Sequence, residues 1–433
     1  MVELKECPIC HKENWKKLDY LRDHKYWQDI DYITLDEKCD MKICKECGFV
    51  TYDYVELDRL TDNYDRQRPV LNSGNIITCN RKNEYHETFL KEMLMGEECR
   101  DWNVLDVGCA QGSFLDSLAG YGLHNLYGTE FSTAFRAFGK HEYRLNITKE
   151  IDESVKYDFI SYYHVLEHCQ HPDKELQKAR ELLEDDGYLY IAVPTWFDKL
   201  EQDSGSDVGS FEELFHMNHV NCFTKQSLHN IINTNGFEII KENEHIYGLT
   251  VLCKKSDIKM LVVLEDYKEI VKTLSNHKEA ISLLHAKQFD DALKLEPKFP
   301  DVYIYKSLQK DNMQSLDKQV EILDEGLKHN PDCMRLLLQK GKIHFQWDEN
   351  TPDKIGYYSN NIKTAEELFK YVLEYKSGNE DIYYFLSMIE LKYKLDYDKA
   401  VEYMKECLRI NPSKFHECWN IIATIYKEKE CQK

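Results

Sequence analysis

Four cysteines near the start of the chain have the spacing of a metal site. Cys7 and Cys10 form one Cys-x-x-Cys pair, and Cys44 and Cys47 form a second pair that is followed by a glycine. Two thiolates separated by two residues can hold one side of a tetrahedral zinc ion, and a second pair completes the site. Because sulfur fills all four positions, we expect a structural Zn2+ with no open position for catalysis. A redox-active Cys-x-x-Cys is the alternative, and the second pair argues against it.

A second group of residues has the spacing of a nucleoside-binding loop. The run from Asp106 to Gly112 (Asp-Val-Gly-Cys-Ala-Gln-Gly) follows an apolar segment and precedes residues with helical spacing. Small residues let a backbone approach a ligand closely and adopt positive φ, and the free N–H groups at a helix start favour a carboxylate. Glu130 ends the next apolar segment, where a carboxylate can accept hydrogen bonds from both hydroxyls of a ribose.

The elements that must position these residues are strands and helices in alternation. We expect strands at 102–107, 125–129, 157–163, 187–193, 237–241 and 246–254, and helices at 84–100, 113–121, 174–183 and 224–235. This alternation predicts an α/β domain with a mostly parallel sheet and helices on both faces.

The C-terminal part of the sequence reads as helices with a repeat. Similar phrases begin at four leucines, Leu293, Leu327, Leu373 and Leu408, and three of the phrases end in proline. Their spacing is close to the period of about 34 residues found in tetratricopeptide repeats, which this region resembles. The longest interval would contain an insertion, at 347–361. A plain helical bundle is the alternative, and either form could bind a protein partner or a second copy of the chain.

Length and composition bound the organisation of the protein. At 433 residues the chain exceeds one ordinary domain. We expect a zinc-binding module at 1–60, the α/β domain at 61–255 and an all-α repeat domain at 256–433. The content of 42% hydrophobic and 31% charged residues is typical of a folded globular protein.

Charge and cysteine content limit the class of partner. The formal net charge is −21, and the only short basic cluster is around Arg66, Arg68, Arg81 and Lys82. Both observations argue against nucleic acid or an anionic membrane as partner. The sequence has no apolar run typical of a secretory leader or a membrane span. Fifteen cysteines in such a chain fit reduced thiols, so we expect a cytoplasmic protein.

The loop and the segments after it resemble those of class I S-adenosylmethionine (SAM)-dependent methyltransferases, whose fold is Rossmann-like. The family's loop reads Asp/Glu-x-Gly-x-Gly-x-Gly, and here Ala110 replaces the middle glycine. The phrases 164–168 (His-Val-Leu-Glu-His) and 186–194 also match the family. A nicotinamide-binding Rossmann domain is the competitor, but its loop has no acidic residue directly before the first glycine. The resemblance implies that these residues bind the cofactor: Asp106, Gly108, Ala110, Gly112, Glu130, Asn146, Ile147 and His164.

The cysteine module and a later phrase narrow the resemblance to sugar C-methyltransferases, which act on nucleotide-linked deoxysugars. Their phrase Tyr-x-Glu-His-x-x-x-Phe-Ser/Thr corresponds to 216–224 here, with His216 and Asn218 in place of the tyrosine and glutamate. An imidazole that titrates near neutral pH suits a general base. We expect His219 to be this base, assisted by His168 or His216. The lost glutamate leaves O- and N-methylation open beside C-methylation of a small-molecule or nucleotide-sugar acceptor.

Two other interpretations stay open. The four-cysteine module also resembles that of bacterial ribosomal RNA methyltransferases, although the acidity and the phrase at 219–223 argue against that reading. The helical tail could make the chain chiefly a protein-interaction scaffold in which methyl transfer is secondary. The Asp106 and Glu130 carboxylates argue against a purely structural role.

Overall fold

The computed structural model describes most of the chain in two compact units. The described residues are 2–18, 41–52, 54–55, 99–195, 219–245, 248–258, 261–309, 311–312, 315–331, 333–349, 358–375, 380–410 and 415–431. Among them the first unit runs to Leu274 and the second begins at Ser275, so that the boundary falls within helix α8 (Tyr267–His285). Apart from Cys99 and Arg100, the expected helix at 84–100 lies outside the described residues, and so does His216.

The first unit contains a seven-stranded sheet in the order β12-β13-β10-β9-β6-β7-β8. The strands are β6 (Asn103–Val107), β7 (Asn125–Thr129), β8 (Asn146–Thr148), β9 (Tyr157–Tyr163), β10 (Leu183–Val193), β12 (Phe237–His245) and β13 (Gly248–Lys255). The neighbouring strands β8, β7, β6, β9 and β10 run parallel to one another. Strand β13 is antiparallel to both β10 and β12. The short connection between His245 and Gly248 makes β12 and β13 a hairpin, which can pair only antiparallel. The sheet is therefore mixed, with a parallel majority.

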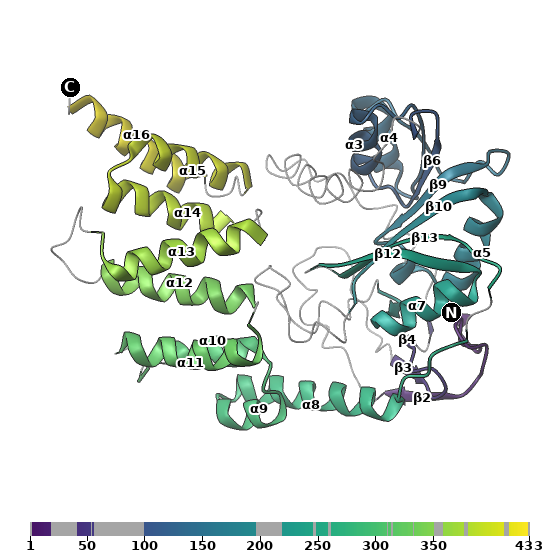
Figure 1. Ribbon diagram of the computed structural model, residues 1–433, viewed down its shortest axis with the longest axis horizontal. Helices are drawn as coiled ribbons and strands as arrows, with labels where there is room; N and C mark the ends of the chain where they lie inside the picture. Colours follow the sequence, from purple (N-terminus) through teal and green to yellow (C-terminus); the bar gives the residue numbers. More distant parts are fainter. Residues whose placement is uncertain are drawn as a thin grey trace. The chain divides into compact units, whose positions relative to one another are not determined.

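Helices cover both faces of this sheet (Figure 1). Helix α3 (Ser113–Gly120) packs with Val104, Phe159 and Tyr190, and α4 (Thr133–Glu142) lies on the same side. Helices α5 (Pro172–Leu182) and α7 (Lys225–Thr234) pack on the opposite face. The alternation of side chains along each strand produces these two separate apolar faces. The fold is the expected Rossmann-like α/β arrangement.

The cysteine-bearing segment folds as small strands that join the first unit. Strands β2 (Trp15–Leu18), β3 (Met41–Cys44) and β4 (Val50–Tyr52) form a sheet that β11 (Asn221–Cys222) completes. A second small pair joins β1 (Val2–Glu3) to β5 (Tyr54–Val55). Three of the cysteines lie in the same apolar cluster as α5 and α7. The cysteine segment thus shares its core with the large sheet.

The second unit is helical throughout its described residues. After α8 the helices are α9 (Phe289–Leu295), α10 (Pro300–Ser307), α11 (Leu316–His329), α12 (Met334–Glu349), α13 (Asn360–Tyr375), α14 (Glu380–Ile389), the π-helix η5 (Glu390–Lys394), α15 (Tyr397–Ile410) and α16 (Phe415–Cys431). The leucines of the four repeated phrases lie in α9, α11, α13 and α15, each toward the C-terminal end of its helix. From α10 to α16 each α-helix contacts the next along the chain, as stacked helical pairs do. Of the helices described, none is both long and apolar enough to cross a membrane.

Two glycines provide a test of how α4 holds the loop after β6. A Cβ on Gly139 of α4 would lie 2.6 Å from the carbonyl oxygen of Gln111 and would collide with Ile147. A Cβ on Gly120, at the end of α3, would meet no atom within 4 Å. We predict that Gly139→Ala lowers the free energy of unfolding of the first unit by about 1–3 kcal/mol, the usual cost of overpacking.

The matched variant Gly120→Ala should leave that free energy unchanged or raise it by up to about 1 kcal/mol, because alanine is the better helix former. Urea denaturation followed by circular dichroism measures both variants. Equal stabilities for the two variants would show that α4 does not press on the loop.

Candidate active site

The loop after β6 takes a backbone conformation that suits small residues. Gly108, Ala110 and Gly112 have φ of 66°, 48° and 87°, all in the left-handed region. A Cβ on Gly108 would lie 2.7 Å from Val165, and one on Gly112 would lie 2.5 Å from Leu145. Glycine is therefore required at both positions, whereas Ala110 carries its Cβ at positive φ. Two backbone hydrogen bonds hold the loop: the Cys109 N–H donates to the Thr129 carbonyl, and the Gly112 N–H donates to the Cys109 carbonyl.

Helix α3 begins directly after this loop, so its first backbone N–H groups lie beside it. Gly112 is the N-cap residue, and as a glycine it provides no side-chain cap for the helix. The first N–H groups of a helix have no partner within the helix, and they carry the positive end of its dipole. This helix start can therefore bind a carboxylate such as that of an amino-acid ligand.

Asp106 is buried beneath the loop. Its side chain is only 2% exposed, and its Oδ1 accepts a hydrogen bond of 2.7 Å from the Ser161 hydroxyl. Burial raises the pKa of Asp106 from 3.8 to about 7; the Ser161 hydrogen bond opposes this shift, and the nearby Glu130 charge adds to it. Asp106 is thus a carboxyl group whose ionisation a nearby cation, such as an ammonium, would favour.

Glu130 connects the end of β7 to the loop. Its Oε2 accepts a hydrogen bond of 3.0 Å from the Ala110 N–H, and its Oε1 accepts one of 2.7 Å from the Ser132 N–H. Burial raises the pKa of Glu130, while these backbone donors and Arg136 pull it down. The Phe131 backbone also hydrogen-bonds this carboxylate. A carboxylate has about four acceptor positions, so capacity stays available for a ligand hydroxyl. Asp106 lies near the end of β6 and Glu130 directly follows β7, so both lie at the same edge of the sheet.

A third group of polar side chains follows β9, the strand on the other side of β6. His164 has φ of 53°, and the 3-10 helix η3 (Leu166–His168) comes next. Glu167 is fully buried, and its Oε1 lies 3.1 Å from His164 Nδ1 and 3.8 Å from His168 Nε2. His219 comes from a distant segment, and its ring centroid lies 5.0 Å from that of His168. The structure therefore brings three predicted histidines around one carboxylate.

Burial opposes the ionisation of Glu167, but its neighbours outweigh burial. The hydrogen bond with His164 and the charges of His168, His164 and His219 hold the pKa of Glu167 below its usual value. Its second oxygen, Oε2, is buried without a hydrogen-bond partner among the described residues. Such an oxygen is costly unless a ligand or water reaches it. We therefore regard Glu167 as part of the candidate site.

Glu167 was not singled out from the sequence, although the pattern contains a clue. In the phrase 164–168 only two residues separate His164 from Glu167, so a local contact between the two side chains is possible. Asn146 and Ile147 were expected after the third strand of the fold, whereas they lie within it, in β8. Ile147 is fully buried, next to Gly112, Gly128 and Gly139. It packs beneath the loop.

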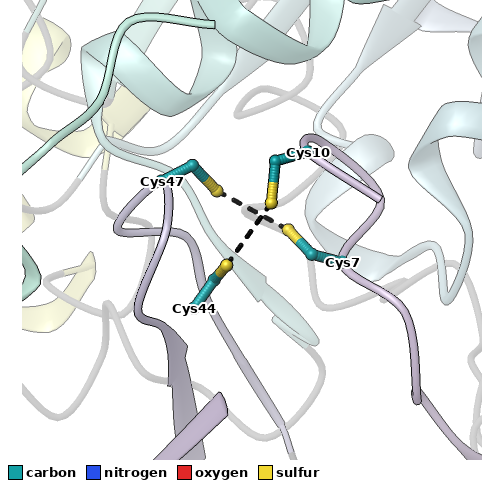
Figure 2. Close-up of side chains that lie close together, drawn as sticks. All are labelled: Cys7, Cys10, Cys44 and Cys47. Atoms are coloured by element: carbon teal, nitrogen blue, oxygen red, sulfur yellow. Dashed lines mark hydrogen bonds between the residues drawn. The ribbon is translucent and has the colours of Figure 1, made fainter. Parts of the chain in front are cut away.

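The four cysteines converge on one point (Figure 2). The Cys7 and Cys47 sulfurs lie 3.6 Å apart, and the Cys10 and Cys44 sulfurs lie 3.5 Å apart. All four sulfurs are within 4.8 Å of one another. Zn–S bonds of about 2.3 Å at tetrahedral angles place sulfurs about 3.8 Å apart, whereas a disulfide needs about 2.05 Å. The arrangement fits a tetrahedral metal ion.

The two cysteine pairs have the same turn geometry. The N–H of His11 donates to the Cys7 carbonyl, and the N–H of Gly48 donates to the Cys44 carbonyl. His11 and Gly48 both directly follow the second cysteine of their pair, and both have positive φ, 56° and 79°. These matched turns explain why each pair directs both of its sulfurs to one side.

Comparison with known proteins finds matches for the α/β part of the chain. Residues 55–242 match a family model described as a methyltransferase domain. The chain is 28% identical over 103 residues to the mitochondrial ubiquinone biosynthesis O-methyltransferase of Candida albicans; the match covers 21% of this chain and 32% of that protein. The chain thus spans about a third of the length of this curated relative. The first unit carries a methyltransferase domain.

Two solved structures that resemble part of the chain are named as methyltransferases. Magnesium protoporphyrin IX methyltransferase from Synechocystis PCC 6803, with bound SAH, is 14% identical and matches 40% of this chain and 81% of its own, with a TM-score of 0.32. The plantazolicin methyltransferase BpumL, in complex with SAH, is 15% identical and matches 46% and 91%, with a TM-score of 0.34.

The raised pKa of Asp106 predicts a pH-dependent stability. The folded chain keeps a proton that the unfolded chain releases above about pH 4, so the Asp106 contribution destabilises the fold increasingly up to about pH 7. In Asp106→Asn the side chain still accepts the Ser161 hydrogen bond and has no proton to lose. We predict that this variant becomes more stable than the wild type as the pH rises from 4 to 7, with a constant difference above pH 8.

Urea denaturation of both proteins at pH 5 and pH 8 measures this difference. Ser161→Ala retains the Asp106 carboxyl and removes the hydrogen bond that opposes the shift, so its pH dependence should be at least as large as that of the wild type. Parallel stability curves for the wild type and Asp106→Asn would refute the raised pKa.

Proposed function

We propose that the chain is a SAM-dependent methyltransferase that modifies a small hydroxylated acceptor. The observation that carries the proposal is the position of the loop 108–112. It lies at the edge of the sheet where Asp106 and Glu130 end adjacent strands and where the buried Glu167 gathers histidines after the next strand. In open α/β sheets this edge, between strands whose connections turn in opposite directions, is where ligands bind.

The residues of the loop fit SAM by their chemistry. The uncapped start of α3 suits the carboxylate of the amino-acid part, Asp106 suits its ammonium group, and Glu130 suits the ribose hydroxyls. When bound, SAM supplies a methyl group on a sulfonium centre. The chain's residues then hold and orient this donor without taking part in bond formation.

The histidines after β9 and in the 219–223 segment support acid–base work. In the proposed reaction His219 accepts the proton of the acceptor hydroxyl on a ring nitrogen as the oxygen receives the methyl group. The imidazolium that forms lies near the Glu167 carboxylate, whose charge stabilises it. His168, and His216 if it lies nearby, would help to orient the acceptor.

The class of acceptor rests on the resemblance and on one relative. The sugar C-methyltransferase resemblance favours a nucleotide-linked sugar or glycan, and the Candida albicans relative is named as an O-methyltransferase. The glutamate missing at position 218 favours oxygen over carbon as the acceptor atom. A nucleotide sugar methylated on a hydroxyl satisfies all three observations.

We further propose that the four cysteines hold one structural Zn2+. The sulfur separations of 3.5 and 3.6 Å, together with the matched turns, support this assignment. The helical repeats of the second unit resemble tetratricopeptide repeats, and we propose that they bind a protein partner or a second copy of the chain.

The experiment that tests this function is an incubation of the full chain with SAM and a panel of nucleotide sugars. We expect one nucleotide sugar to gain the mass of one methyl group while SAM is converted to SAH. Fragmentation of the product then distinguishes a methyl ether from a C-methyl group. If RNA but no sugar is methylated, the ribosomal RNA interpretation replaces this proposal.

Variants of the histidine cluster test the acid–base role. We predict that His219→Ala lowers kcat by about 10²–10⁴-fold, the usual contribution of a general base. Glu167→Gln keeps the shape of the side chain but removes its charge, and it should lower kcat and shift the pH profile without changing SAM affinity. The exposed His124→Ala provides the control and should behave as the wild type. An unchanged kcat in His219→Ala would remove this residue from the role of base.

A further inference from the structure

One buried side chain, Asn221, connects the cysteine segment with the histidine cluster. Asn221 lies two residues after His219 and is only 1% exposed. Its Nδ2 donates hydrogen bonds of 2.9 Å to the Leu166 carbonyl and 2.6 Å to the Cys169 carbonyl. These two carbonyls bracket Glu167 and His168. A single amide thus fixes the segment that holds the buried carboxylate.

The amide oxygen of Asn221 faces strand β4. Its Oδ1 accepts a hydrogen bond of 3.3 Å from the Thr51 hydroxyl, and the two residues are register partners in the β4–β11 pair. The Thr51 hydroxyl and the Tyr52 N–H also donate to the carbonyl of Val220, the residue directly after His219. The backbone that carries His219 is therefore paired with the cysteine segment.

Strand β4 is in turn continuous with the second cysteine pair. Phe49 lies between Gly48 and the first residue of β4, and its carbonyl accepts the Cys44 N–H at 2.8 Å. The Phe49 ring packs on that of Phe223, with centroids 5.7 Å apart. The connection from the cysteine sulfurs through β4 and β11 to His219 is therefore made of buried, hydrogen-bonded neighbours. Small metal-binding segments depend on the ion for their fold, so losing the ion would loosen this connection.

We propose that Asn221 is a positioning residue that couples the four-cysteine centre to the cluster of Glu167, His168 and His219. Metal occupancy then controls the placement of His219 against Glu167, while the loop 108–112 keeps its own conformation. This inference rests on the proposed function because it takes His219 as the base. It makes the metal centre a regulator of turnover as well as a structural element.

The test uses Asn221→Ala in the full chain, with Asn230→Ala as its matched control. Asn230 is also 1% exposed and also bonds a distant backbone segment, through Val263, but it has no contact in common with Asn221. We expect Asn221→Ala to keep one zinc per chain in native mass spectrometry and to keep the SAH affinity of the wild type. Its kcat should fall about 100-fold, the effect of a displacement near 1 Å, with little change in KM. Asn230→Ala should keep the wild-type kcat.

A second readout does not depend on activity. In protein labelled with 13C at histidine Cε1, we expect the His219 resonance and its pH titration to move in Asn221→Ala. They should move in the same direction when a chelator removes zinc from the wild type. Thr51→Val, which removes only the hydroxyl, should give a smaller movement.

Three results would overturn the coupling: a His219 titration in Asn221→Ala that matches the wild type, one in the metal-free protein that matches the zinc-loaded protein, or an equal loss of kcat in Asn230→Ala. Failure of the proposed function would be recognised separately, as absence of SAH binding and of methylated product in the wild type.

Discussion

The central constraint on this protein is the reversal of strand order beside β6. The chain moves from β6 to β7 and β8 in one direction, and then returns to place β9 and β10 on the other side. The connections that leave β6 and β9 therefore lead to opposite sides, and in open α/β sheets ligands bind at such a point. The Asp106 carboxylate near the end of β6, the Glu130 carboxylate after β7 and the cluster around Glu167 after β9 all lie at this edge. The topology thus brings the residues proposed to bind the cofactor and those proposed for acid–base work to one edge of the sheet.

The second constraint on the structure is a buried carboxyl group, that of Glu167. Glu167 is fully buried, and the histidines from two segments that surround it hold its pKa below the usual value despite burial. Removing a carboxylate from water costs several kcal/mol unless it is paired, and the neighbouring imidazoles provide that pairing. The cluster therefore needs His219 to be held in place from outside the large sheet. The strand pair β4–β11 holds the segment that carries His219. This pairing is one consequence of the core that the cysteine segment shares with the rest of the first unit.

Much of the sheet could be predicted from the sequence, because buried strands are short apolar runs bounded by turns. Strands β7 and β9 have the expected limits, Asn125–Thr129 and Tyr157–Tyr163. Strand β10 begins earlier than expected, at Leu183, because its irregular start contains acidic residues that do not look like a strand. The direction of β12 and β13 could not be predicted, since periodicity reports burial and not pairing. The methyltransferase domain was predicted from its loop, and the family comparison confirms it.

The site residues that escaped prediction are those whose role depends on distant partners. In the sequence Glu167 looks like any other acidic residue. Its burial among histidines appears only when the segment after β9 meets the segment that contains His219. Asn221 is similar, because its three hydrogen-bond partners come from β4 and from both ends of η3. Local spacing cannot encode such contacts. The four-cysteine cluster was different, since each cysteine pair lies in a local turn that its own spacing predicts.

The central claim is that the edge of the sheet beside β6 binds the methyl donor. Isothermal titration calorimetry of SAH into the full-length, zinc-loaded chain tests it most directly. The account predicts saturable binding of one SAH per chain, with SAM competing for the same site. Absence of heat for both compounds, in protein whose circular dichroism shows the folded state, would contradict it.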